Sequence, residues 1–220
     1  MSAQVDSYAN AIAHLPAGGT LILHDVSWED YEQLLADLGA SSGVRVSYEN
    51  GRLEIMSPSL AHEVYKDLIL YMARLVAEEM DVMLESGGST TFKDQRLAQG
   101  AEPDNCFYVQ NASRIIGKSN IDLVVDPPPD IIVEIDVSHE STAKLSFYAS
   151  IGAPELWRYD ERRLRIYRLS ERRYIETEAS SALPVITSNA LTTFLEQCKT
   201  DGQSKTLRSF REWLSNTAHR

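Results

Sequence analysis

The stretch Ile131-Ile132-Val133-Glu134-Ile135 decides the fold, because it is apolar throughout except for one carboxylate. A run of this kind, taken here from 131 to 137, is typical of a central β-strand that is covered on both faces of its sheet. An ionised carboxylate in such a strand is costly unless a cation or several hydrogen bonds accompany it. Glu134 is therefore the first residue to consider for chemistry.

Strand and helix patterns surround this central strand. Residues 44–56 alternate apolar and polar side chains around Asn50-Gly51, which is typical of a β-hairpin. A long helix then runs to about Met80, with an expected apolar stripe made of Leu60, Val64, Leu68, Tyr71, Met72, Leu75 and Val76. The other expected strands are 20–24, 82–85, 90–93, 104–109, 155–159, 164–169 and 174–177, and the other expected helices are 27–38, 141–150, 189–199 and 206–215.

The composition bounds the class of protein. The chain has 220 residues, 43% of them hydrophobic and 24% charged, which fits one soluble globular domain with short terminal appendages. We expect a lead with the first strand over 1–24, a main domain over 25–200 and a helical appendage over 201–220. Apolar stretches fall short of the roughly 20 residues that cross a bilayer, and the N-terminus has no secretory pattern, so we expect a cytoplasmic protein without membrane contact. Cys106 and Cys198 are expected to be buried free thiols.

The charge distribution bears on nucleic-acid binding. The net charge of −11 argues against non-specific adhesion to nucleic acid. Basic side chains are nevertheless concentrated from Arg158 to Arg173, where seven arginines accompany three acidic residues. This basic region has two interpretations: it contacts DNA phosphates, or it is the solubilising, edge-protecting face of an exposed hairpin.

Other carboxylates can accompany Glu134. Asp136 lies on the same strand face, roughly 7 Å further along, and two such carboxylates can flank a hard cation such as Mg²⁺; alternatively they bond to backbone amides or to an arginine. Asp130 is too far away for one metal, at roughly 13 Å along the same strand. Asp104 begins a different strand, which can lie beside the Glu134 strand. Asp104 is therefore the better partner.

Four motifs follow one another along the chain. They are Met56-Ser57-Pro58-Ser59 with His62, Glu102-Pro103-Asp104, the segment from Pro128 to Ile135, and Lys144 through Tyr148 to Gly152-Ala153-Pro154-Glu155-Leu156-Trp157. In this order, over residues 25–195, the sequence resembles the Uma family, a large bacterial group related to restriction endonucleases within the PD-(D/E)XK nuclease superfamily. The segment from Pro128 to Trp157 is the most specific part of the resemblance.

The resemblance implies an α/β (α+β) fold with a restriction-endonuclease-like core, in which a mixed central β-sheet is flanked by helices. It implies that Asp104 and Glu134 bind Mg²⁺, for which Mn²⁺ can substitute, together with the carbonyl oxygen of Ile135. The superfamily pattern places a lysine two residues after the glutamate, where this chain has Asp136. Lys144 could bring its ammonium into the site from the following helix, or be an exposed helix lysine. The segment from Glu134 to Lys144 also looks shorter than in many relatives.

The resemblance also points to the long helix, because related nucleases carry an acidic residue on the helix before the core strands. Glu63 is the favoured candidate and His62 is its neighbour. These side chains point about 100° apart, so we expect them not to share one role. The other interpretation of Glu63 is a solvated helix face. His139 is a candidate metal ligand or loop cap.

The function expected from this resemblance is metal-assisted hydrolysis of phosphodiester bonds in DNA. Lys144 would orient the attacking water, and Asp136 would join a second metal or tune the first. One alternative is a catalytically silent domain of the same fold that oligomerises or binds a partner. A second alternative keeps the metal but hydrolyses RNA or a small phosphate ester. Edge strands and tyrosines in the C-terminal half make a homodimer plausible.

Overall fold

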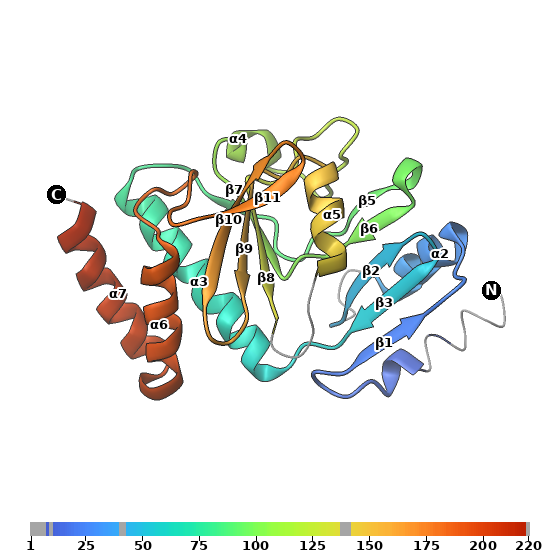
Figure 1. The fold of residues 1–220 in the computed structure, drawn as a ribbon, viewed down its shortest axis with the longest axis horizontal. Coiled ribbons are helices and arrows are strands. Elements are labelled where there is room, and N and C mark those ends of the chain that lie inside the picture. Colours follow the sequence, from blue (N-terminus) through green and yellow to red (C-terminus); the bar gives the residue numbers. More distant parts are fainter. Residues whose placement is uncertain (1–7, 9–10, 40–42, 137–141, 219–220) are drawn as a thin grey trace. The chain divides into compact units, whose positions relative to one another are not determined.

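The computed structural model describes residues 8, 11–39, 43–136 and 142–218 (Figure 1). The chain divides into two compact units, each with its own hydrophobic core. The first unit comprises Met1–Leu60 and Thr91–Glu102, and the second comprises Ala61–Thr90 and Pro103–Arg220. Within the described ranges, no helix is both long enough and apolar enough to cross a lipid bilayer.

The first unit is an antiparallel sheet with a helix packed on it. Its strands are β1 (Thr20–Leu23), β2 (Arg45–Glu49), β3 (Arg52–Met56), β5 (Phe92–Asp94) and β6 (Gln99–Ala101), in the spatial order β1-β3-β2-β6-β5. Helix α2 (Trp28–Leu38) begins after Ser27, the start of the helix expected over 27–38, and the Ser27 hydroxyl oxygen caps the helix by accepting a hydrogen bond from the amide of Asp30 at 3.0 Å. A 3₁₀ turn, η1 (Gln95–Leu97), joins β5 to β6.

The β2–β3 hairpin confirms the strongest local prediction. Asn50 and Gly51 have φ values of 47° and 89°, and a two-residue type I′ turn requires positive φ at both positions. Burial alternates along both strands, so that Val46 and Tyr48 of β2 face the core together with Leu53 and Ile55 of β3. The period of two in the sequence therefore corresponds to one buried and one solvated sheet face.

The second unit has the architecture that the resemblance implies, a mixed sheet flanked by helices. Its strands are β4 (Glu85–Ser86), β7 (Asn105–Tyr108), β8 (Ile131–Ile135), β9 (Glu155–Tyr159), β10 (Leu164–Ser170) and β11 (Arg173–Thr177), in the spatial order β11-β10-β9-β8-β7-β4. Strands β8 and β9 are parallel, and the other neighbouring strands are antiparallel. Its helices are α3 (Leu60–Glu79), α4 (Ala112–Ile115), α5 (Thr142–Ser150), α6 (Ser188–Asp201) and α7 (Gln203–Ala218).

Strand β8 is the predicted central strand. It lies between β7 and β9, and all five of its side chains are buried. Because side chains alternate along a strand, β8 has two different faces. Ile131, Val133 and Ile135 belong to the hydrophobic core that also contains buried residues of α3 and α6. Glu134 points to the opposite face, where α5 supplies its partners.

Helix α3 is rotated relative to the predicted apolar stripe. Its buried residues are His62, Tyr65, Leu68, Ile69, Met72, Ala73, Val76 and Ala77. By contrast, the predicted stripe residues Leu60 and Tyr71 are 82% and 50% exposed. The predicted stripe leaves out Tyr65 and Ile69, whose burial shows which side of the helix faces the core. As a result, His62 lies on the buried side.

Several other features differ from the sequence expectations. The strand expected over 82–85 is shifted to Glu85–Ser86, and β6 and α4 were not expected. Strand β6 contains Gly100 and no β-branched residue, so hydrogen bonding to β2 and β5 on its two sides, rather than local propensity, makes it a strand. Helices α6 and α7 are separated by Gly202 alone instead of a polar linker over 200–205. Both cysteines are free and buried, as expected.

Candidate active site

Glu134 is held by two side chains from helix α5. The hydroxyl of Tyr148 donates a hydrogen bond to Oε1 of Glu134 at 2.5 Å, and Nζ of Lys144 lies 3.1 Å from Oε2 and 3.5 Å from Oε1. Lys144 and Tyr148 are four residues apart, so they lie on the same side of the helix. The carboxylate itself is deeply buried, since Glu134 is 2% exposed. Of the two sequence interpretations of Lys144, the structure therefore shows the one in which its ammonium reaches the glutamate.

Burial dominates the protonation of Glu134. The pKa of Glu134 is raised to about 8, chiefly by loss of hydration and also by the nearby charges of Asp104 and Asp136, although Lys144 and Tyr148 lower it. At neutral pH the carboxyl group therefore holds a proton for most of the time. This is the behaviour of a buried acid whose surroundings supply too little positive charge.

Asp104 lies close to Glu134, immediately before β7. Strands β7 and β8 are antiparallel, and their register ends with Asn105 opposite Val133. The amide of Asp104 donates to the carbonyl oxygen of the same Val133 at 3.1 Å. The side chain of Asp104 accepts a hydrogen bond from the amide of Ile135, the residue after Glu134, and its charge acts on Glu134. The structure thus brings together the two acids that the sequence analysis paired.

The carboxylate of Asp104 contacts a protein group at each oxygen. The amide of Ile135 donates to Oδ2 at 2.7 Å, and Nε2 of His62 lies 2.9 Å from Oδ1. Asp104 is 1% exposed. Burial alone would raise the pKa of Asp104, but the hydrogen bond from His62 and the charge of Lys144 bring it below its ordinary value. Asp104 and Glu134 therefore form an unequal pair, one ionised and one protonated at neutral pH.

On helix α3, His62 rather than the favoured Glu63 reaches Asp104. The side chain of Glu63 is 39% exposed and forms an ion pair with Lys66 on the same helix. Glu63 and His62 also contact each other, since Oε1 of Glu63 lies 3.6 Å from Nδ1 of His62. His62 is buried against Asp104, whereas the half-exposed Glu63 also pairs with Lys66. The missed signal was the buried spacing of His62 with Tyr65 and Ile69.

Asp136 is paired with an arginine, which is one of the partners considered for it in place of a metal ion. Its Oδ2 forms an ion pair with Nε of Arg158, and both side chains are largely buried. Arg158 stands opposite Glu134 in the parallel register of β8 and β9. The position where the superfamily pattern has a lysine thus carries an acid with its own cation. His139, the remaining candidate, lies outside the described residues.

The donor set suits a magnesium ion. Asp104 and Glu134 offer oxygen atoms from adjacent strands, and Ile135 follows Glu134 directly, with its amide already bound to Asp104. Mg²⁺ prefers such oxygen ligands and commonly binds only one or two protein carboxylates, keeping several waters. Elsewhere in the described parts of the chain, and here too, no three His, Cys, Asp or Glu side chains gather closely enough to hold a metal ion. A metal at this site would therefore depend on two carboxylates.

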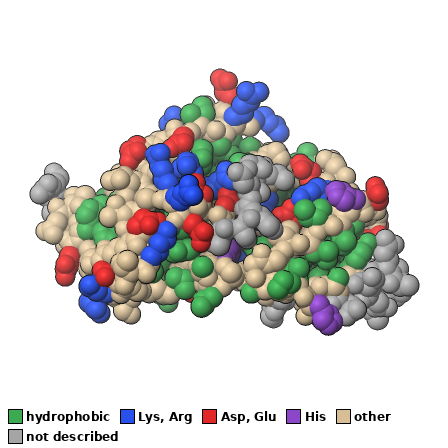
Figure 2. Space-filling model, turned by 60° about the horizontal axis from the view of Figure 1, so that its bottom comes forward, with side chains coloured by type: hydrophobic (Ala, Val, Ile, Leu, Met, Phe, Trp, Pro, Cys, Tyr) green, Lys and Arg blue, Asp and Glu red, His purple; other side chains and the backbone are tan. Residues whose placement is uncertain are grey.

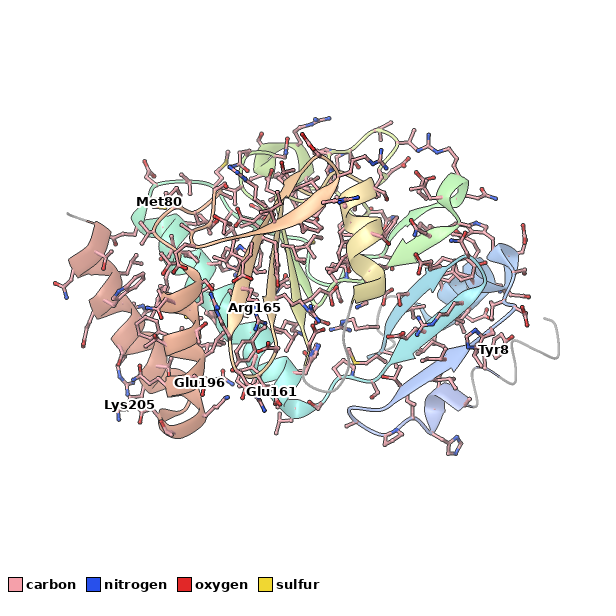
Figure 3. The ribbon with its side chains drawn as sticks, in the orientation of Figure 1. Tyr8, Met80, Glu161, Arg165, Glu196 and Lys205 are labelled. Atoms are coloured by element: carbon pink, nitrogen blue, oxygen red, sulfur yellow. The ribbon has the colours of Figure 1, made fainter. Side chains whose placement is uncertain are left out.

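The arginines of the β9–β11 region are partly neutralised by acids. Arg165 on β10, labelled in Figure 3, pairs with Asp160 at 2.5 Å. Arg163 pairs with Glu176 of β11 at 3.2 Å. On the face shown in Figure 2, Lys and Arg side chains are interspersed with Asp and Glu side chains. The local excess of arginine is therefore a weaker basic surface than the sequence count indicates.

Comparison with known proteins agrees with this fold. The family model of Uma2, described as "Putative restriction endonuclease", matches residues 28–196. Among solved structures, the chain is similar to the crystal structure of "a putative nuclease belonging to DUF820" from Anabaena variabilis, with 15% sequence identity, a TM-score of 0.50, and coverage of 73% of this chain and 96% of that chain. No curated protein matches the chain. Because the family match spans most of its length, this chain belongs to the Uma2 family.

Proposed function

We propose that the second unit is a magnesium-dependent nuclease that hydrolyses phosphodiester bonds in DNA. The observation that carries this proposal is the placement of Asp104 beside the end of β8, where its carboxylate binds the amide that follows Glu134, with Lys144 in contact with Glu134. The family description supports a nuclease, and DNA is the substrate that a restriction endonuclease cuts. A cytoplasmic location and a homodimer stay predictions.

In this proposal the chain's own residues divide the work. Asp104, Glu134 and the carbonyl oxygen of Ile135 would hold Mg²⁺, which when bound lowers the pKa of a coordinated water and stabilises negative charge on the phosphate. Tyr148 keeps the Glu134 carboxylate in place through its hydroxyl. The ammonium of Lys144 lies at the same carboxylate, where it can orient an attacking water and stabilise charge on the phosphate. Lys144 thereby takes the role of the lysine that is missing at position 136.

Asp136 would tune this site through Arg158 rather than bind a second metal. Its carboxylate is already engaged by the guanidinium, which faces Glu134 from the next strand. The exposed arginines 162, 168, 172 and 173 would contact DNA phosphates, and their contribution would decline as salt is added. A salt titration of DNA binding by a variant lacking two of these arginines measures that contribution.

One observation favours the catalytically silent alternative. All four carboxylate oxygens of Asp104 and Glu134 already contact protein donors, so the site can be internally satisfied. The net charge of −11 also opposes DNA binding. A silent domain would give no site-specific heat when titrated with Mg²⁺ or Mn²⁺.

The proposed function is tested by incubating supercoiled plasmid DNA with the protein and Mg²⁺. We expect nicking by the wild-type protein and by the control variant Asp201→Ala, which removes a carboxylate at the end of α6. Asp104→Ala should lose nicking while keeping its circular dichroism spectrum. Equal nicking by wild type and Asp104→Ala would remove the assignment. Parallel incubations with RNA and with a small phosphate ester distinguish the substrate classes.

A further inference from the structure

We propose that His62 is a positioning residue that holds the carboxylate of Asp104 in the orientation that the site uses. The inference deepens the proposed function and rests on it for its catalytic meaning. His62 lies in the first turn of α3 and would act on the metal site only through its contact with Asp104.

The imidazole of His62 contacts two carboxylates. Its Nε2 lies 2.9 Å from Oδ1 of Asp104, and its Nδ1 lies 3.6 Å from Oε1 of Glu63. The imidazole therefore bridges a buried carboxylate and a half-exposed one, and His62 itself is 2% exposed. Nε2 is therefore the imidazole nitrogen that faces Asp104, in a close ion-pair contact.

The contact with His62 gives the Asp104 carboxylate a second point of attachment. The amide of Ile135 holds Oδ2, which ties one oxygen to β8. A single tethered oxygen still lets the carboxylate turn about its side-chain bonds. The imidazole on Oδ1 ties the other oxygen to α3, a helix of 20 residues whose buried side packs in the main core. A hydrogen bond from β8 and an ion-pair contact from α3 thus hold the two oxygens of the carboxylate.

The contacts of His62 favour a positioning role over metal binding by His62 itself. His62 contacts Asp104, whereas Glu134 is held by side chains of α5. Over the ranges that the structure describes, His62 does not combine with these two acids into a three-residue metal site. His62 therefore acts through Asp104. Partners of metal ligands in this outer position commonly change metal affinity about 10–100-fold when they are removed.

The experiment has a readout that needs no metal. In the metal-free protein, amide hydrogen exchange of Ile135 reports how firmly Asp104 accepts its hydrogen bond, and the amide of Val133 on the same strand serves as an internal control. His62→Leu removes the donor and leaves an apolar side chain, while His62→Gln keeps an N–H donor. Asp104→Ala gives the exchange rate of Ile135 with no acceptor at all. His62→Met replaces His62→Leu should the latter not fold.

We expect His62→Leu to speed exchange of Ile135 about tenfold or more, toward the Asp104→Ala value, with Val133 unchanged and His62→Gln close to wild type. Calorimetric titration with Mn²⁺ should show about 10–100-fold weaker binding for His62→Leu and partial recovery for His62→Gln. An Ile135 exchange rate in His62→Leu equal to that of the wild type overturns the inference. Absence of Mn²⁺ binding by the wild-type protein would instead overturn the proposed function, and the exchange rates would still decide the role of His62.

Discussion

Replacing Glu134 by glutamine tests the charge state of the buried acid. The raised pKa of Glu134, about 8 against an ordinary value of 4.5, means that the folded state binds this proton more tightly than the unfolded state does. The stability of the wild-type protein should therefore fall as pH rises from about 4.5 to about 8, because the unfolded chain releases the proton first. Glutamine has nearly the same shape and does not titrate, so this contribution disappears in Glu134→Gln.

The size of the effect follows from the shift. This difference in pKa between the unfolded and folded states corresponds to a loss of about 5 kcal/mol in the free energy of unfolding once Glu134 is fully ionised. Local relaxation in the folded protein can lower that loss, so we expect about 2–5 kcal/mol. Urea unfolding at pH values from 5 to 9 should show Glu134→Gln near wild-type stability at pH 5. By pH 9 the variant should be more stable than wild type by that amount.

The matched control is Glu176→Gln, which changes an exposed glutamate of β11 that pairs with Arg163. Its stability should stay within about 0.5 kcal/mol of wild type at every pH, since exposed ion pairs contribute little. A difference between Glu134→Gln and wild type that does not change with pH would refute the reasoning, because Glu134 would then have the same proton affinity in both states.

Three further predictions concern single contacts. Tyr148→Phe removes the hydroxyl that lowers the pKa of Glu134. In the same urea series, the free energy of unfolding of this variant should therefore stop falling at a higher pH than that of the wild-type protein. Asp130→Ala removes the acceptor for the amides of residues 109 and 111 and should cost about 3 kcal/mol in urea unfolding, while calorimetry shows unchanged Mn²⁺ affinity. Gly100→Ala would place Cβ 2.2 Å from the hydroxyl of Tyr31 and should destabilise the first unit by about 1–3 kcal/mol in thermal unfolding, with partial relief by Tyr31→Phe.

Features that depend on neighbouring residues could be predicted from the sequence. The Asn50-Gly51 turn and the Ser27 cap rest on local backbone chemistry, and both occur as expected. The central strand is defined by its own apolar run. The pairing of Asp104 with Glu134 was also within reach, because strand spacing alone excludes Asp130 from the same metal site. Asp130 in fact caps the loop after β7 through the amides of residues 109 and 111.

Features that depend on packing between distant segments could not be predicted in this way. The rotation of α3, which turns His62 toward Asp104 and leaves Glu63 half-exposed, is decided by burial of Tyr65 and Ile69 in the core. The attachment of β5 to the first sheet depends on β6, whose three residues carry no strand signal of their own. The contact of Tyr148 with Glu134 could have been predicted in part, because Tyr148 is four residues after Lys144 on the same helix. It also requires knowing that α5 covers the Glu134 face of β8.

The central claim is that two acids from neighbouring strands hold one divalent ion. Anomalous diffraction from a crystal soaked in Mn²⁺ tests it most directly, since it locates the ion independently of any assay. We expect one peak within ligand distance, about 2.2 Å, of oxygen atoms from both Asp104 and Glu134, and loss of that peak in Asp104→Ala. A wild-type crystal without a peak between these two carboxylates, or with a peak elsewhere only, would contradict the account.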